Sequence, residues 1–149
     1  PASRFVAEFI GSPKMNIWPA VLQERNAQHA QVRVGEAVFQ VAVDAQHLPV
    51  GSAVQLGARP EHLRLTDGTQ AHNSLPATVR HIEKLGECSL LYLDTHVDGV
   101  DGAHTITLKL EGTTALRLGD ALGIAARPDD LHLFDAEGTA CHRTVELPR

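Results

Sequence analysis

The chain has 149 residues, of which 43% are hydrophobic and 21% charged, and its formal net charge is −5 with neutral histidines. This composition is typical of a globular domain with a sizeable core and excludes a disordered chain. It also argues against a general nucleic-acid binder, because the balance is acidic and the lysines and arginines are scattered.

Two cysteines, Cys88 and Cys141, lie far apart and neither belongs to a CxxC or another ligand pair. A disulfide stays open, although two free structural thiols in a reducing compartment fit the pattern better. No apolar run approaches the roughly 20 residues that cross a bilayer, and no leader peptide is evident. We therefore expect a soluble, cytoplasmic chain, and the missing initiator methionine suggests a fragment of a longer protein.

The first predicted element is a short helix over residues 5–10. Phe5, Phe9 and Ile10 share one face of a helical pattern, and Gly11-Ser12-Pro13 ends it. Because only about one turn of helix fits, this piece is stable only when it docks on a larger body.

Strands fill the rest of the first half. Residues 15–23 predict a strand in which Pro19 indicates an edge position or a bulge. Residues 31–34 alternate strictly, and the alternation resumes over 37–43 after the two-residue turn Gly35-Glu36. This pattern predicts a β-hairpin.

The second half follows a polar link over residues 66–76. Its predicted elements are a strand over 77–85, a turn at Gly86-Glu87, a strand over 88–93, an exposed loop over 95–103, a strand over 105–110 and a polar tail over 136–149. About ten short strands with one helical turn are typical of an all-β fold. We expect two small OB-like barrels or half-barrels.

A phrase that occurs twice organises the chain, because residues 50–67 align with 118–135 without a gap. The identical pairs include Gly51/Gly119, Ala58/Ala126, Arg59/Arg127, Pro60/Pro128, Leu63/Leu131 and Leu65/Leu133. Each copy predicts a strand, a proline turn and a new strand with one buried face. We favour duplication over chance, since the matches fall on turn residues and on one strand face. It predicts two similar units, about 17–70 and 71–149.

The sequence contains none of the common catalytic or metal-binding motifs. Its nine histidines form no HxH, HxxxH or HExxH pattern, and there is no phosphate-binding loop, dinucleotide fingerprint or nucleophile elbow. Asp94, Asp98 and Asp101 lie in a turn-rich stretch, where a hydrated loop is expected rather than a catalytic pair. We predict neither an enzyme active site nor a metal site.

The repeated turn offers one candidate site. Arg59 and Glu61 flank Pro60, and Arg127 and Asp129 flank Pro128, beside Gly57 in the first copy. The arginines could bind an anion or a partner. We favour the simpler interpretation, in which each arginine–acid pair holds its own turn together.

Two phrases together resemble a known family. FVAEFIGSPKMN at residues 5–16 and GARPEHL at 57–63 resemble the C-terminal regulatory region of the ATP-binding subunit of sugar-importing ABC transporters, of the maltose and glycerol-3-phosphate type. In that family the first phrase marks the junction between the nucleotide-binding domain and a β-rich domain. IEKLGE at 82–87 and LHLFD at 131–135 resemble later segments, so the resemblance covers nearly the whole chain. Ala58 departs from the family pattern, which has a larger residue there.

The resemblance implies a non-catalytic module of tandem OB-like units of the TOBE or molybdate-binding-like kind. Residues 1–16 would be the linker from an absent ATP-binding domain, which would hold ATP and Mg²⁺; this fragment itself would need no cofactor. The linker residues that would dock on the β domain are Phe5, Phe9, Ile10, Gly11, Ser12, Pro13, Met15 and Asn16. Implied partners are the ATP-binding domain, a second copy of the subunit, the membrane subunits and a regulatory protein, on the cytoplasmic face of the membrane.

Three functions stay open. The first is regulation and dimerisation of an import ATPase, and the second is sensing of an oxyanion or a sugar between the two barrels by Arg59 and Arg127. The third, nucleic-acid binding, ranks last because aromatic residues make up only 4% of the chain and a stacking platform needs them.

Overall fold

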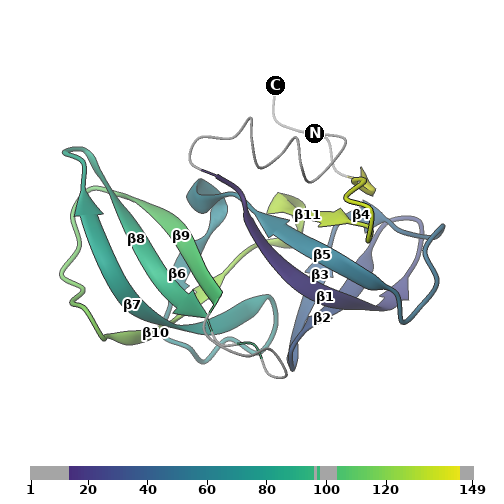
Figure 1. Ribbon diagram of the computed structural model, residues 1–149, viewed down its shortest axis with the longest axis horizontal. Coiled ribbons are helices and arrows are strands. Elements are labelled where there is room, and N and C mark those ends of the chain that lie inside the picture. The colour runs from purple at the N-terminus through teal and green to yellow at the C-terminus, as the bar shows by residue number, and fades with distance from the viewer. Residues whose placement is uncertain (1–13, 96, 98–103, 145–149) are drawn as a thin grey trace.

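The computed structural model describes residues 14–95, 97 and 104–144. These residues form twelve strands and two short 3-10 helices, which confirms the predicted all-β class. Most of the strands belong to two curled five-stranded antiparallel sheets that lie side by side (Figure 1). The predicted helix over residues 5–10 lies outside the described residues.

The first sheet has the strand order β11-β5-β1-β2-β3. Its strands are β1 (Asn16–Arg25), β2 (Ala30–Val34), β3 (Ala37–Val41), β5 (Ala53–Ala58) and β11 (Leu131–Phe134). The predicted hairpin is confirmed, since Val34 pairs with Ala37 across a two-residue turn in which Gly35 has a φ of 60°. Only glycine adopts this backbone conformation at little cost.

The second sheet has the order β6-β10-β7-β8-β9. Its strands are β6 (Arg64–Thr66), β7 (Ser74–Lys84), β8 (Cys88–Thr95), β9 (His104–Glu111) and β10 (Ala121–Ala125). Two further strands, β4 (Val43–Asp44) and β12 (His142–Arg143), pair with each other outside the two sheets.

The two sheets exchange strands. β6 follows β5 in the chain, but it joins the second sheet by pairing Leu65 with Ile124. β11 follows β10, but it joins the first sheet by pairing Leu133 with Leu56. Each sheet therefore takes one of its edge strands from the other half of the sequence. Neither half of the sequence supplies all five strands of a sheet. The predicted units 17–70 and 71–149 therefore stay a prediction.

The chain crosses between the sheets at the two arginine–proline turns. Arg59 (φ −75°, ψ 143°) precedes the 3-10 helix η1 (Pro60–His62), and Arg127 (φ −77°, ψ 147°) precedes η2 (Pro128–Asp130). Both arginines are extended, as a following proline requires. η1 packs against β9 and η2 against β3, so each crossing contacts an edge strand of a sheet.

Two predictions about individual segments have different outcomes. The predicted edge position or bulge at Pro19 is confirmed in part: β1 lies inside its sheet, but β2 pairs only with Val21 to Arg25, so Pro19 has one neighbouring strand, and the β1–β2 register shifts between Leu22 and Glu24. The stretch over 136–149 is not simply a polar tail. Ala140 pairs with Phe134, Cys141 is buried, and β12 follows. The polar composition of this stretch gave no sign that its backbone pairs with Phe134 and with β4.

One hydrophobic core joins the two sheets. It includes side chains that are less than 2% exposed from both, among them Trp18, Leu56 and Leu133 from the first and Leu91 and Leu108 from the second. Alternation along β8 places Ser89, Leu91, Leu93 and Thr95 inward, as expected for a strand with one buried face.

A buried asparagine immediately before β7, Asn73, joins the two sheets through hydrogen bonds. The side chain of Asn73 accepts from the Gln40 amide at 2.8 Å and donates to the carbonyls of Gln40 and Ala126 at 2.9 and 3.1 Å. Its own backbone N–H donates to Val38. The side-chain amide thus continues the edge of β3 as a further strand would, and Asn73 takes a left-handed φ of 56° to do so.

Asn16 makes the corresponding link from the start of β1. Its Nδ2 donates to the Thr107 carbonyl and its Oδ1 accepts from the Thr107 amide, both at 2.8 Å. The edge of β9 is therefore continued by an asparagine of the first sheet, and the edge of β3 by an asparagine that opens the second. We call these two arrangements the asparagine brackets.

Replacement of Asn73 by alanine should destabilise the protein by roughly 2–4 kcal/mol, since it leaves buried groups of Gln40 and Ala126 unpaired and keeps a strained φ. Chemical denaturation measures this. Asn26→Ala is the matched control: its Oδ1 accepts two bonds in an exposed turn, and its loss should cost about 1 kcal/mol or less. Equal losses of unfolding free energy in the two variants would contradict the stabilising role assigned to the Asn73 bracket.

Candidate functional site

The part of the expected linker that the structure describes packs on the β domain. Met15 is 2% exposed and contacts Phe134 of β11, with Ile17 and Ala140 at the border of this small cluster. Asn16 forms its bracket with Thr107. The other proposed docking residues, from Phe5 to Pro13, lie outside the described residues, so their role stays a prediction.

Gly57 lies beneath this cluster, near the end of β5. A Cβ atom at this position would lie 2.7 Å from the Met15 sulfur and 3.0 Å from Cε2 of Phe134. These distances are shorter than ordinary contacts, so glycine lets the two large side chains cover the strand. This close packing explains Gly57 without a ligand.

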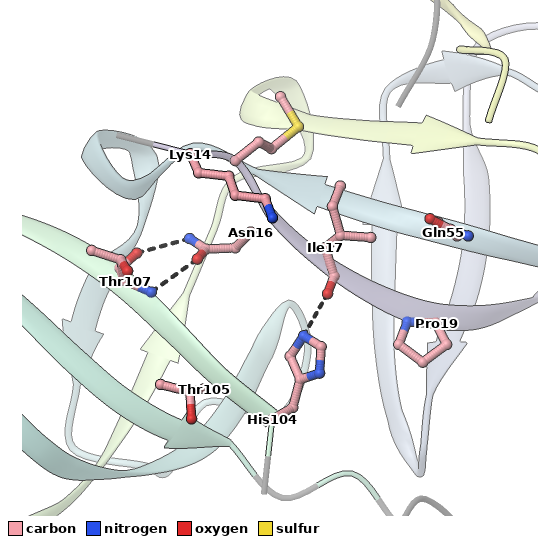
Figure 2. A pocket seen from close by; sticks show the side chains of 9 residues that line it. Lys14, Asn16, Ile17, Pro19, Gln55, His104, Thr105 and Thr107 are labelled. Atoms are coloured by element: carbon pink, nitrogen blue, oxygen red, sulfur yellow. Dashed lines mark hydrogen bonds between the residues drawn. The ribbon is translucent and has the colours of Figure 1, made fainter. Parts of the chain in front are cut away.

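A groove of about 460 Å³ opens where the first sheet meets β9 (Figure 2). Residues of β1 and β5 form one wall and residues of β9 the other; the lining side chains are Lys14, Met15, Asn16, Ile17, Pro19, Gln55, His104, Thr105 and Thr107. The His104 ring crosses the groove and its Nε2 lies 2.5 Å from the Ile17 carbonyl oxygen. The groove is thus bridged by two polar links, His104 to Ile17 and Asn16 to Thr107.

The sequence did not indicate this groove. Its polar side chains come from three strands that are distant in the sequence, and no motif links them. The one available signal was the strict alternation over residues 105–110, which puts Thr105 and Thr107 on the same face of β9.

The two arginine–proline turns do not form a shared site. Neither Arg59 nor Arg127 lines the groove. Arg127 lies on the surface and pairs with Asp130 at 3.5 Å, not with Asp129. The Asp129 carbonyl instead accepts a hydrogen bond from the Arg143 guanidinium. These contacts stay within the turn and its neighbour β12, and such exposed ion pairs contribute little to stability.

His132 is the one buried histidine among the described residues, at 7% exposure. Its ring stacks on Phe134, with centroids 6.4 Å apart. Burial lowers the pKa of His132 from 6.5 to about 4, and the nearby guanidinium groups of Arg143 and Arg59 act in the same direction. His132 is therefore neutral in the folded protein at neutral pH and offers no positive charge there.

Both cysteines are free, and burial raises the pKa of the Cys141 thiol to about 11, so this thiol is unreactive. Within the described ranges, no three His, Cys, Asp or Glu side chains are placed to hold a metal ion. None of the helices there is long and apolar enough to cross a membrane.

Gly57→Ala should destabilise the fold by roughly 1–3 kcal/mol, because the new methyl group meets Met15 and Phe134. A double-mutant cycle with Met15→Ala measures the clash: removing the flexible Met15 side chain should relieve part of it, so the double variant should lose less than the sum of the single losses. Additive losses, measured by urea unfolding, would contradict the packing described for Gly57.

The free energy of unfolding should fall as the pH is lowered from about 7 to about 4. The unfolded chain takes up a proton at His132 near its ordinary pKa of 6.5, whereas the folded protein resists protonation down to about 4. The unfolded state therefore binds more protons in this window. Denaturant unfolding at a series of pH values should show a shallower decline in His132→Gln than in the unchanged chain. Identical declines of the unfolding free energy in the two proteins would contradict the lowered pKa assigned to His132.

Two family models match overlapping parts of the chain. The model described as the TOBE domain matches residues 56–134, and the one described as the MalK OB fold domain matches residues 11–63. The first covers both arginine–proline turns and the whole second sheet; the second covers most of the first sheet.

Several curated relatives match nearly the whole chain. It is 35% identical over 144 residues to the maltose/maltodextrin import ATP-binding protein MalK of Vibrio parahaemolyticus, covering 96% of this chain and 37% of that protein. It is 38% identical over 141 residues to the sn-glycerol-3-phosphate import ATP-binding protein UgpC of Cupriavidus metallidurans, covering 92% and 36%. The alpha-glucoside transport ATP-binding protein AglK of Rhizobium meliloti is 35% identical over 138 residues.

A solved structure of the cytoplasmic molybdate-binding protein ModG, with molybdate bound, has the same fold. The TM-score is 0.63 at 19% identity, over 79% of this chain and 94% of ModG. The chain spans little more than a third of the length of its curated relatives, and it resembles their TOBE region, not their ATPase domain. It belongs to the TOBE domain family.

Proposed function

We propose that this chain is the non-catalytic regulatory and dimerisation domain of the ATP-binding subunit of an ABC importer for sugars or glycerol 3-phosphate. One observation carries the proposal: the MalK OB-fold and TOBE models together take up residues 11–134, and relatives named as importer ATP-binding proteins align over more than 90% of the chain.

The role of such a domain is mechanical. The exchanged strands and the asparagine brackets hold the two sheets together, so the domain moves as one body. In a dimer of the parent subunit, two such bodies would stay in contact while the ATP-binding domains open and close. The first described residue, Lys14, lies within the stretch proposed as the linker (residues 1–16), and the attachment of its last residues, Met15 and Asn16, to the β domain would transmit that motion to the domain.

The names of the relatives, import ATP-binding proteins, imply the partners that this chain would have. The ATP-binding domain, with ATP and Mg²⁺, would lie upstream of the linker, and the membrane subunits and a regulatory protein would complete the assembly. The parent subunit would then lie on the cytoplasmic face of the membrane.

We also propose that the two halves arose by duplication, which is supported by the equal strand orders of the two sheets and by the matching arginine–proline turns.

The chain should form a concentration-dependent dimer if it pairs the parent subunits. Light scattering over a wide concentration range measures its mass. A monomer at every concentration would contradict dimerisation through this domain alone, and would favour docking of a partner or ligand instead.

The purified chain should also show no ATP turnover; activity that follows the chain through purification would contradict the non-catalytic assignment.

A further inference from the structure

Three glutamine side chains form a row across the outward face of the first sheet. Gln40 Nε2 donates to Gln31 Oε1 at 2.8 Å, and Gln31 Nε2 donates to Gln23 Oε1 at 3.0 Å. They come from β3, β2 and β1 in that order. The alternation of these strands turns all three away from the core, and each is half-buried. We call this arrangement the amide row.

The amide row begins at a β-bulge. Gln23 is an extra residue in β1, since the register of β1 against β2 shifts between its neighbours Leu22 and Glu24. A bulge bends its strand and re-aims the side chain of the extra residue. Here the side chain of Gln23 reaches Gln31 on the neighbouring strand.

The second sheet has the same bulge but no amide row. Its extra residue is Arg80, which stands between Val79 and His81, where the register of β7 against β8 shifts. The Arg80 guanidinium lies 3.5 Å from Asp94 of β8 and donates to the Thr105 hydroxyl of β9 at 3.3 Å. A bulge in this fold is therefore held across three strands without any glutamine.

The other two positions of the row also differ between the sheets. Gln40 and Thr107 are equivalent, because the backbone of each holds an asparagine bracket. Their partners on the neighbouring strands are Gln31 and Tyr92. The fold thus accepts a tyrosine and a threonine at these positions, so the three amides are a property of this surface and not a requirement of the fold.

The amide row lies in a hollow of about 380 Å³, a volume in the range of small-molecule sites. The three glutamines and the buried Ala30 form its lower part, since the other lining residues are exposed. One of these exposed residues is acidic and one is an arginine, so the lining has no formal net charge with histidine counted as neutral. The exposed lining residues are Glu24, Arg25, Asn26, His29 and Val50.

The amide row presents donors and acceptors at regular intervals. A carboxamide has two N–H donors and an oxygen with two lone pairs. The row uses one donor of Gln31 and one of Gln40, while Gln23 Nε2 and Gln40 Oε1, at its two ends, take no part in it. Successive amides lie on adjacent strands, about 4.8 Å apart. Alternate hydroxyl groups of a pyranose ring have a similar separation, and each hydroxyl both donates and accepts.

Val50 gives the hollow an apolar side. It is 56% exposed, and it is one of three large hydrophobic residues in the described part of the chain that are more than half exposed. A sugar ring carries hydroxyl groups at its edge and C–H groups on its faces. Such a ring therefore fits a row of amides that lies beside an apolar side chain.

We propose that this hollow binds a neutral sugar. The hydroxyl groups of a pyranose ring exchange hydrogen bonds with the amides of Gln23, Gln31 and Gln40, and one face of the ring packs on Val50. The site lies on one sheet and includes neither arginine of the repeated turns, so it differs from a site between two barrels. It goes beyond the proposed role in import and dimerisation, because binding needs only this chain.

Amide chemical shifts and calorimetry of the chain test the proposal with glucose, maltose, glycerol and gluconate. We expect glucose or maltose to shift the side-chain NH₂ signals of Gln23, Gln31 and Gln40 in a saturable way. Glycerol, which has no ring, should bind far more weakly, and gluconate, which is open-chain and charged, should bind no better than glycerol. The signals of Arg80 and Tyr92, at the matching places of the second sheet, should not move.

Two variants separate the parts of the site. Gln31→Ala removes the central amide and should weaken sugar binding about tenfold or more, as expected for the loss of one or two hydrogen bonds. Gln46→Ala removes an exposed glutamine outside the row; it is the matched control and should change nothing. Val50→Ser leaves the amide row intact and, because Val50 is exposed, should fold normally and weaken binding severalfold.

No saturable shift with either sugar would overturn the proposal, and so would equal affinities of Gln31→Ala and the unchanged chain. Tighter binding of gluconate than of glucose would overturn it as well, because a lining without net charge gives no preference for an anion. None of these results bears on the mass or the ATP turnover of the chain, which test the proposed function.

Discussion

The architecture depends on two asparagine side chains that act as pieces of backbone. A carboxamide presents one donor and one acceptor in a plane, as a peptide unit does, and can therefore occupy the edge of a strand. Asn16 does this on β9 and Asn73 on β3. Strand edges are prone to pair with other chains, and here part of each edge is occupied from the opposite sheet. The brackets join the sheets and protect their edges with the same hydrogen bonds.

A second consequence is the position of the groove. The bracket at Asn16 holds β1 close to β9 at one point, and the His104 ring holds it at another. Trp18 of the first sheet also donates to the Thr95 hydroxyl of the second at 3.2 Å. The walls are thus set by short polar contacts, which makes the groove a defined cavity and not a variable gap between two bodies.

The sequence predicts the fold class and most strands because alternation, glycine turns and prolines are local signals. The hairpin at Gly35 and the strict alternation over 105–110 are examples. Pro19 indicated an edge position or a bulge, and it does have only one neighbouring strand; the sequence could not show that β1 is otherwise an inner strand, because this depends on β2, which is too short to reach Pro19. The tail was missed because Cys141 and β12 are held by distant partners. The groove could not be foreseen, since its residues meet only after strands from both halves are placed.

The sequence indicated some of the candidate residues and gave no sign of others. Gly57 was singled out as part of a repeated phrase, and the structure explains it by the side chains of Met15 and Phe134 that cover it. Gln55, two residues earlier on the same face, carried no signal because an isolated glutamine in a strand is common. Only its pairing with Pro19 and its unpaired oxygen distinguish it.

Strand exchange has a consequence for synthesis of the chain. The first sheet receives β11 only when residues 131–134 are available, which is nearly at the end of the described chain. Until then β5 has a free side, with Gly57 uncovered by Phe134. The nascent first half is thus an open template that waits for its last strand, and such long-range pairing folds slowly. During translation the first half therefore carries an unpaired edge on β5 until residues 131–134 have been made.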